Sequence, residues 1–231
     1  MILSSVISFF KKMRLNTLKS FDKNIPTSQL RISICEQNTD IAQIFSKVFE
    51  KVPYVEILQG NIFHLKAQAI VSPANSFGDM SGGFDKALDN FFEGNLQPKV
   101  LKHIQNHYLG EMPVGVADTI ATSNAWYPYL IIAPTMRIPS NVGQSIHAYL
   151  AMRAILIAII KHNLSSENKI NHFVMPSLCT GVGRMPYQEA GEQILTAIHN
   201  ILEGGWKESV HPALAPYSIK KNDSNFSLKT L

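Results

Sequence analysis

The sequence predicts a three-layer α/β/α domain built on a central mixed sheet. Short apolar segments with the length of buried strands alternate with longer apolar or amphipathic segments typical of helices. Polar or glycine-rich loops follow several of these strands, at the sheet edge where open α/β folds bind ligands. Of the 231 residues, 45% are hydrophobic and 16% charged, which supports a sizeable core. We expect the domain to span residues 30–205, between an extension (1–29) and a tail (206–231).

The composition excludes several classes of protein. The net charge of +4 is compatible with an anionic ligand, but no dense stripe of Lys and Arg with interleaved aromatic residues indicates sequence-specific nucleic-acid binding. The two cysteines provide neither a disulfide framework nor a metal cluster, and the histidines are scattered, so we expect no metal site and no cofactor. Such cysteine usage is typical of a reducing compartment, and we predict a cytoplasmic protein.

The extension begins with an apolar run, residues 1–10, which precedes Lys11, Lys12 and Arg14. A signal peptide carries its positive charges before the apolar region, so this order argues against one. The run is also too short to span a bilayer. We predict a flexible extension. The alternatives are a true chain start at Met13 and a peripheral membrane contact through an amphipathic helix.

The first elements of the domain form a strand–helix–strand unit. Residues 31–35 alternate between polar and apolar side chains, which predicts a strand. Residues 38–40 offer an N-cap for a helix over 41–51, whose apolar residues share one face. A second strand is expected over 54–58, and a turn that contains Asn61 follows it.

The most informative loop follows a short buried strand over 69–71, which a proline ends. Asn75 then lies at the carboxyl end of that strand, and two glycines, 82–83, precede the first turn of a helix. A helix start of this kind exposes unpaired N–H groups that suit a phosphate. Asp85 comes ten residues after Asn75, on the other side of the phosphate site. The alternative is a simple tight turn at the glycines with Asp85 as a helix cap.

The rest of the chain continues the alternation of strands and helices. Between Asp85 and Gly110 we expect helical sequence broken at Gly94 and Pro98. Arg137 follows a strand end, as a phosphate or ribose contact or, more simply, as a solvated loop residue. The later segments are a turn and strand (112–122), a buried strand (129–133), an apolar core helix (144–162), a strand (172–176) and an amphipathic helix (189–202).

Two loops and a turn of this sequence resemble the ADP-ribose-binding macrodomain family. Ser-Pro-Ala-Asn at 72–75 and Gly-Gly-Phe-Asp at 82–85 are similar to the family's Asn-Ala-Ala-Asn, glycines, hydrophobic residue and Asp. The loop 177–186 is similar to the family's Ser-Thr-Gly-Ile-x-Gly-x-Pro loop, and the family's Pro-x-Gly turn is found at 113–115. The resemblance covers about residues 55–200 and implies the family's three-layer fold.

Two positions depart from the family pattern. Asn61 stands where the family carries an Asp that accepts a hydrogen bond from the adenine amino group. Its amide oxygen can still accept that bond, though without a full charge. The second loop keeps Thr180 and Gly181, but it has Gly183-Arg184 where the family usually has a bulky residue and then glycine. Arg184 could add a charge contact.

The resemblance also implies how ADP-ribose is held. Asn61 would face adenine, the two glycine loops would hold the diphosphate, and Asn75 would contact the distal ribose. Asn75 and Asp85 are the implied catalytic residues, with Asp85 orienting the distal ribose and a water molecule. The implied ligand contacts are Asn61, Ile62, Ala74, Asn75, Gly82, Gly83, Phe84, Cys179, Thr180, Gly181, Val182, Gly183 and Arg184.

The implied function is binding of ADP-ribose, free or on a modified macromolecule, with hydrolysis of ADP-ribosyl esters. The esters are mono-ADP-ribosylated protein or O-acetyl-ADP-ribose. Keeping both Asn75 and Asp85 favours a hydrolase, and the alternative is a non-catalytic reader of ADP-ribose or ADP-ribosylated partners. Another nucleotide enzyme is disfavoured, because neither a Walker lysine motif nor a Gly-x-Gly-x-x-Gly fingerprint is present. Cys179, with no histidine close by in sequence, is expected to be a packing residue and not a nucleophile.

Overall fold

The computed structural model describes residues 30–207, and the predictions for the extension and for the tail beyond residue 207 lie outside that range. Within it, no helix has both the length and the apolar character needed to cross a membrane. The sheet has six strands. They are β1 (Arg31–Glu36), β2 (Val55–Gln59), β3 (Ala69–Ser72), β4 (Asp118–Ala121), β5 (Tyr129–Ile132) and β6 (His172–Met175).

The strands are ordered β2-β1-β6-β3-β5-β4, and all neighbouring pairs are parallel except β4 with β5. The sheet is therefore mixed, as the sequence predicts. The first strand–helix–strand unit joins this sheet, and β1 lies between β2 and β6. Because five strands are parallel, their carboxyl ends meet along one edge, and the loops that leave those ends can line one continuous site.

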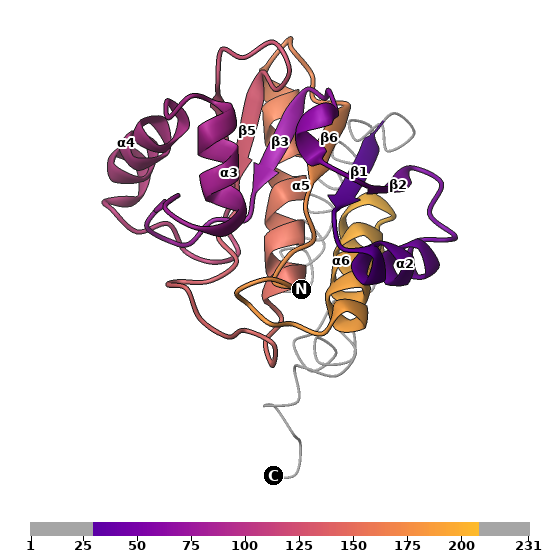
Figure 1. The fold of residues 1–231 in the computed structure, drawn as a ribbon. Helices are drawn as coiled ribbons and strands as arrows, with labels where there is room; N and C mark the ends of the chain where they lie inside the picture. Colours follow the sequence, from indigo (N-terminus) through magenta and orange to yellow (C-terminus); the bar gives the residue numbers. More distant parts are fainter. Residues whose placement is uncertain (1–29, 208–231) are drawn as a thin grey trace, which may run out of the picture.

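Helices cover both faces of the sheet, which gives the three layers α/β/α (Figure 1). Strand β3 shows how the layers are joined, because Ala69 and Val71 belong to the core cluster that contains residues of α2, α5 and α6, while Ile70 belongs to the cluster that contains residues of α3 and α4. This alternation follows from the two-residue period of a strand that is buried on both faces. The helices are α2 (Thr39–Val48), α3 (Gly83–Phe91), α4 (Leu96–Tyr108), α5 (His147–Ser165) and α6 (Tyr187–Leu202), with short 3₁₀ turns η2 (Ile62–His64) and η3 (Gly205–Lys207).

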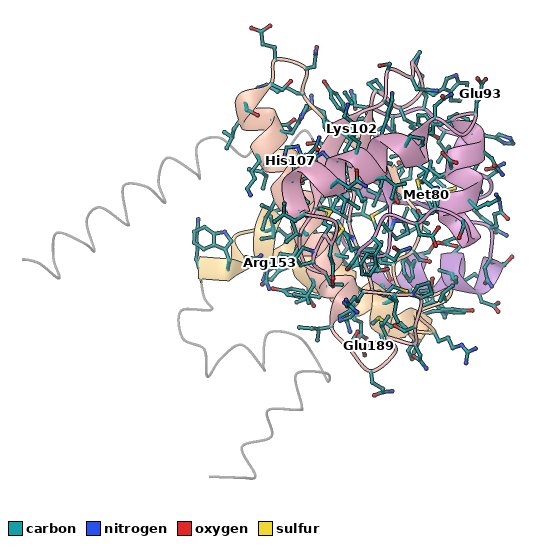
Figure 2. The ribbon with its side chains drawn as sticks, turned by 90° about the vertical axis from the view of Figure 1, so that its left-hand side faces the viewer. Met80, Glu93, Lys102, His107, Arg153 and Glu189 are labelled. Atoms are coloured by element: carbon teal, nitrogen blue, oxygen red, sulfur yellow. The ribbon has the colours of Figure 1, made fainter. Side chains whose placement is uncertain are left out.

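The expected break at Pro98 is wrong, because Pro98 lies inside α4, at its third residue. The first N–H groups of a helix have no intrahelical acceptor, so a proline in the first turn removes no hydrogen bond. Gly94, in contrast, does separate α3 from α4, and its φ of 75° suits glycine. Figure 2 looks onto α4 and shows Lys102 and His107 on its exposed outer side.

Candidate functional site

A pocket of about 750 Å³ lies along the carboxyl edge of the sheet. Residues that follow β1, β2, β3, β5 and β6 all line it, together with the first turn of α3 and the start of α6. Most of the residues predicted from the sequence are thus brought together in one cavity. Those that line it are Ile62, Ala74, Asn75, Gly82, Gly83, Phe84, Asp85, Cys179, Thr180, Gly181, Val182 and Gly183.

Asn75 holds the first loop in shape through its own side chain. Its Oδ1 accepts hydrogen bonds from the N–H groups of Phe77 at 3.0 Å and Asp79 at 3.3 Å. Its Nδ2 donates to the carbonyl of Asp79 at 2.8 Å. An amide nitrogen carries two N–H groups, so one remains for a ligand. Asn75 therefore combines a loop-shaping role with one donor on the pocket wall.

Asp85 lies in the first turn of α3 with only 9% of its surface exposed. Its Oδ1 accepts a hydrogen bond from the buried hydroxyl of Ser72, the last residue of β3, at 2.7 Å. Burial raises the pKa of Asp85 to about 6; the hydrogen bond from Ser72 opposes this rise, and the nearby Asp79 carboxylate adds to it. A carboxyl group with such a pKa can exchange a proton near neutral pH, which suits general acid–base chemistry.

We expect Asp85→Asn to stabilise the protein at pH 8 and to change its stability little near pH 4. In the unfolded chain this carboxyl ionises near pH 4, whereas in the folded protein it stays protonated up to about pH 6. Ionisation therefore costs folding free energy progressively between these values, and the full cost is present above them. Asparagine accepts the bond from Ser72 without ionising, so its benefit at pH 8 is at most about 3 kcal/mol.

Urea unfolding of both proteins at the two pH values measures this difference. The exposed Glu50→Gln serves as a control for the loss of one negative charge, since Glu50 lies on the surface after α2. An equal stability gain at both pH values would contradict the assigned pKa, because only an ionised Asp85 carries the cost.

The start of α3 faces the pocket without a capping side chain. Gly82 is the N-cap residue and makes no side-chain cap bond, and Gly83 follows with a φ of 57° that favours glycine. The first intrahelical bond joins the Lys86 N–H to the Gly82 carbonyl at 3.2 Å, so the N–H groups before it have no intrahelical partner. Together with the helix dipole they form a site suited to an anion.

The second glycine loop is closed by bonds between its own backbone groups. The N–H of Met185 donates to the Cys179 carbonyl at 2.9 Å, and the N–H of Arg184 donates to the Gly181 carbonyl at 3.0 Å. A Cβ at Gly183 would lie 2.5 Å from the Cys179 carbonyl oxygen, so this tight turn requires glycine there. A Cβ at Gly181, in contrast, would meet no described atom within 4 Å.

Cys179 belongs to the hydrophobic core and also lines the pocket. Its side chain is buried, and burial raises the pKa of the thiol to about 12. A thiol with that pKa stays protonated at physiological pH, and only the thiolate is a good nucleophile.

Two predicted contacts, Asn61 and Arg184, do not line the pocket, and their part in ligand binding stays a prediction. The Oδ1 of Asn61 accepts the N–H of Phe63 at 3.0 Å and caps η2. Arg137 is also absent from the pocket wall: it is a solvated loop residue that forms two hydrogen bonds with the carboxylate of Glu111, at 2.7 and 3.0 Å.

Sequence reasoning missed part of the pocket wall. Glu36, Gln37 and Asn38 lie at the carboxyl end of β1, outside the segment that carries the family resemblance. The position of a strand end was the signal that could have found them. Phe63 was missed as well; its ring stacks with those of Phe84 and Phe91, with centroid distances of 6.0 and 5.1 Å. The other missed lining residues include Cys35, Ile41, Gly60, Pro73, Asp79, Ser81, Ala87, Thr135, Met136, Pro139, Pro176, Ser177 and Tyr187.

The charged residues among the described pocket-lining residues are all acidic. None of the described residues that line the pocket is Lys, Arg or His, whereas Glu36, Asp79 and Asp85 all contribute carboxyl groups. An anionic ligand would therefore be held by backbone N–H groups and helix ends, not by cations. Both oxygens of Asp79 accept hydrogen bonds from Ser81, which orders that carboxylate.

Two histidines form a pair with helical spacing, contrary to the expectation that the histidines are scattered. His103 and His107 lie four residues apart on α4, with ring centroids 4.4 Å apart, and His103 also contacts Asp118 at 2.8 Å. Within residues 30–207, no group of three or more His, Cys, Asp or Glu side chains is arranged to hold a metal ion.

Comparison with known proteins points to one family. The model of the Macro domain family matches residues 71–194, the segment that supplies both glycine loops. An uncharacterised protein of Aeropyrum pernix is 29% identical over 152 residues, which covers 65% of this chain and 72% of that protein.

Solved structures give the same answer for the fold. The macrodomain of Mycobacterium tuberculosis DarG has 18% sequence identity and a TM-score of 0.50, over 62% of this chain and 88% of that chain. The Oceanobacillus iheyensis macrodomain with MES bound has 20% identity and a TM-score of 0.52, over 63% of this chain and 75% of that chain. At these identities the likeness establishes the architecture alone. The chemistry has to be inferred from the residues of the pocket.

Proposed function

The chain belongs to the Macro domain family, and from this premise we propose that it binds ADP-ribose and hydrolyses ADP-ribosyl esters. Homologous macrodomains bind ADP-ribose. The observation that carries the proposal is the pocket itself, in which an uncapped helix start and a glycine loop flank Asn75 and Asp85. The esters proposed are those of mono-ADP-ribosylated protein and of O-acetyl-ADP-ribose.

The strand order suggests how the ligand lies. Neighbouring strands are about 4.8 Å apart, so the ends of β2, β1, β6, β3 and β5 span roughly 19 Å. The anion-binding groups, the start of α3 and the loop 179–183, belong to the middle of this row, next to the ends of β3 and β6. The diphosphate lies there, the adenine near η2 at the β2 end, and the distal ribose near Asn75.

Asp85 is suited to the hydrolytic step by its position and its proton affinity. One oxygen is fixed by Ser72, and within residues 30–207 no group donates a hydrogen bond to the other oxygen, Oδ2. No described buried side-chain oxygen lacks a partner, so Oδ2 is accessible to solvent. Above about pH 6 this oxygen accepts a proton from a water molecule whose oxygen bonds to the ester carbon, while the ester C–O bond breaks and frees ADP-ribose and the carboxylate. The remaining N–H of Asn75 holds the distal ribose.

One observation favours a second candidate function, that of a non-catalytic reader of ADP-ribose. Both acceptor positions of the Asn75 amide oxygen are occupied by loop N–H groups, so this oxygen is not free to orient a water molecule. A protein with this loop binds ADP-ribose through its backbone and leaves the ester intact unless Asp85 activates the water by itself.

Two measurements separate these functions. We expect calorimetry with ADP-ribose to give a dissociation constant in the micromolar range, about −8 kcal/mol, with weaker binding of ADP and NAD. Incubation with glutamate-linked mono-ADP-ribosylated protein and with O-acetyl-ADP-ribose should then release ADP-ribose. Binding of ADP-ribose without its release from either ester supports the non-catalytic reader. Absence of ADP-ribose binding contradicts both functions.

A further inference from the structure

The structure places a carboxylate in the pocket at the end of β1, and we propose that Glu36 binds the hydroxyl groups of the adenosine-side ribose and excludes ligands that carry a 2′-phosphate. This inference rests on the proposed binding of ADP-ribose and specifies how that ligand is selected. It assigns a specificity role to a residue outside both glycine loops.

Glu36 is held in a defined position at the pocket wall. It is the last residue of β1, its carbonyl accepts the N–H of Gly60 at 2.9 Å, and its neighbour across the sheet is Gln59 of β2. On the other side its Oε1 accepts the N–H of Ser177, at the end of β6. The carboxylate is thus fixed between the strand ends that precede η2 and the second glycine loop.

The second oxygen of this carboxylate is open to a ligand. Within residues 30–207, no group donates a hydrogen bond to Oε2 of Glu36. Every described buried side-chain oxygen has a partner, so Oε2 is not buried, and Glu36 lines the pocket. The carboxylate of Glu36 is therefore held through Oε1 by the Ser177 N–H, and its Oε2 is available as a charged acceptor for a ligand in the pocket.

The strand order identifies the part of the ligand that meets this acceptor. The sequence of strand ends is β2, β1, β6, so β1 lies between the side of the pocket that contains Ile62 and Phe63 and the loop 179–183. In ADP-ribose the adenosine ribose joins the base to the diphosphate. With the base at the β2 end and the diphosphate at the loop, this ribose lies over Glu36. Vicinal hydroxyl groups donate readily to a carboxylate, as dinucleotide-binding folds demonstrate.

The same carboxylate disfavours a 2′-phosphate. A phosphate on the 2′-oxygen would bring negative charge next to Oε2, and no Lys, Arg or His among the described pocket-lining residues could compensate for it. Dinucleotide-binding folds that accept a 2′-phosphate use an arginine nearby. The pocket is accordingly expected to select the unphosphorylated ribose.

Calorimetry on three proteins tests this role: the wild type, Glu36→Gln and the control Glu50→Gln, whose side chain is exposed after α2. The ligands are ADP-ribose and 2′-phospho-ADP-ribose. We expect the wild type and Glu50→Gln to prefer ADP-ribose by at least about a hundredfold. Glu36→Gln keeps an oxygen for the Ser177 N–H but loses the charge, so the preference should fall at least about tenfold.

The possible results distinguish the role of Glu36 from the proposed binding of ADP-ribose. If the wild type binds ADP-ribose and Glu36→Gln retains the full preference, the role of Glu36 is overturned and ADP-ribose binding stands. An equal loss of affinity for both ligands in Glu36→Gln also overturns it, because that result marks Glu36 as an anchor of Ser177 alone. If the folded wild type binds neither ligand, the proposed function fails, and this inference fails with it.

Discussion

Replacement of Asp85 with alanine is expected to slow the release of ADP-ribose from ester-linked protein at least about a hundredfold and to leave ADP-ribose affinity within a few-fold of wild type. A positioned acid or base contributes about 10²–10⁴-fold to turnover. A group needed mainly in the transition state lowers turnover without weakening the ground-state complex.

The geometry supports this separation of turnover from binding. Asp85 is fixed from the β3 side by Ser72 at 2.7 Å, and it lies among pocket carboxyl groups and no lining cations. A carboxylate aimed at the diphosphate would repel it, so the free oxygen contributes little to affinity and instead acts on the distal ribose and its water. Replacing Asp85 with alanine therefore removes no contact that ground-state binding of ADP-ribose requires.

Single-turnover release measured across pH, together with calorimetry, checks the result. Wild-type turnover should rise through about pH 6, where Asp85 loses its proton. The residual activity of Asp85→Ala should lack this rise. Glu50→Gln, which removes an exposed charge far along the chain from both loops, should behave as wild type. Turnover of Asp85→Ala within tenfold of wild type would remove Asp85 from the chemical step.

The arrangement of the site could be predicted from sequence because it follows from a general property of parallel sheets. Short apolar strands followed by polar or glycine loops place Asn75, Asp85 and the 179–183 loop at one edge, and the pocket lies there. The same property applies to β1, but the resemblance begins after it. Glu36 is therefore not among the predicted site residues, although the predicted strand over 31–35 ends beside it.

The details that the sequence could not provide depend on the path of the chain in three dimensions. Nothing near Asp85 in sequence indicates that Ser72 donates to it, or that burial raises its pKa to about 6. The bonds of Asn75 to its own loop depend on the path of the chain through residues 76–79. The predicted break at Pro98 is wrong because the effect of a proline depends on its position in the helix, and helix starts are poorly defined by sequence alone.

Replacement of Gly181 with glutamate is expected to reduce ADP-ribose affinity at least about a hundredfold, or about 2.8 kcal/mol, in a protein that still folds. Gly181 lines the pocket in the loop proposed to hold the diphosphate. A Cβ there meets no described atom within 4 Å, and the glycine does not adopt the left-handed φ that would strain another residue. The side chain can therefore enter the pocket without distorting the loop, and its charge opposes the diphosphate.

Two control variants separate charge in the pocket from other effects. Gly181→Ala adds a methyl group without charge and should lose much less affinity than Gly181→Glu. Gln105→Glu adds the same charge on the exposed side of α4 and should bind ADP-ribose as wild type does. Thermal unfolding establishes that each variant is folded, and calorimetry gives the affinities. A folded Gly181→Glu with wild-type affinity would exclude the diphosphate from this loop, because a carboxylate beside it cannot be neutral in effect.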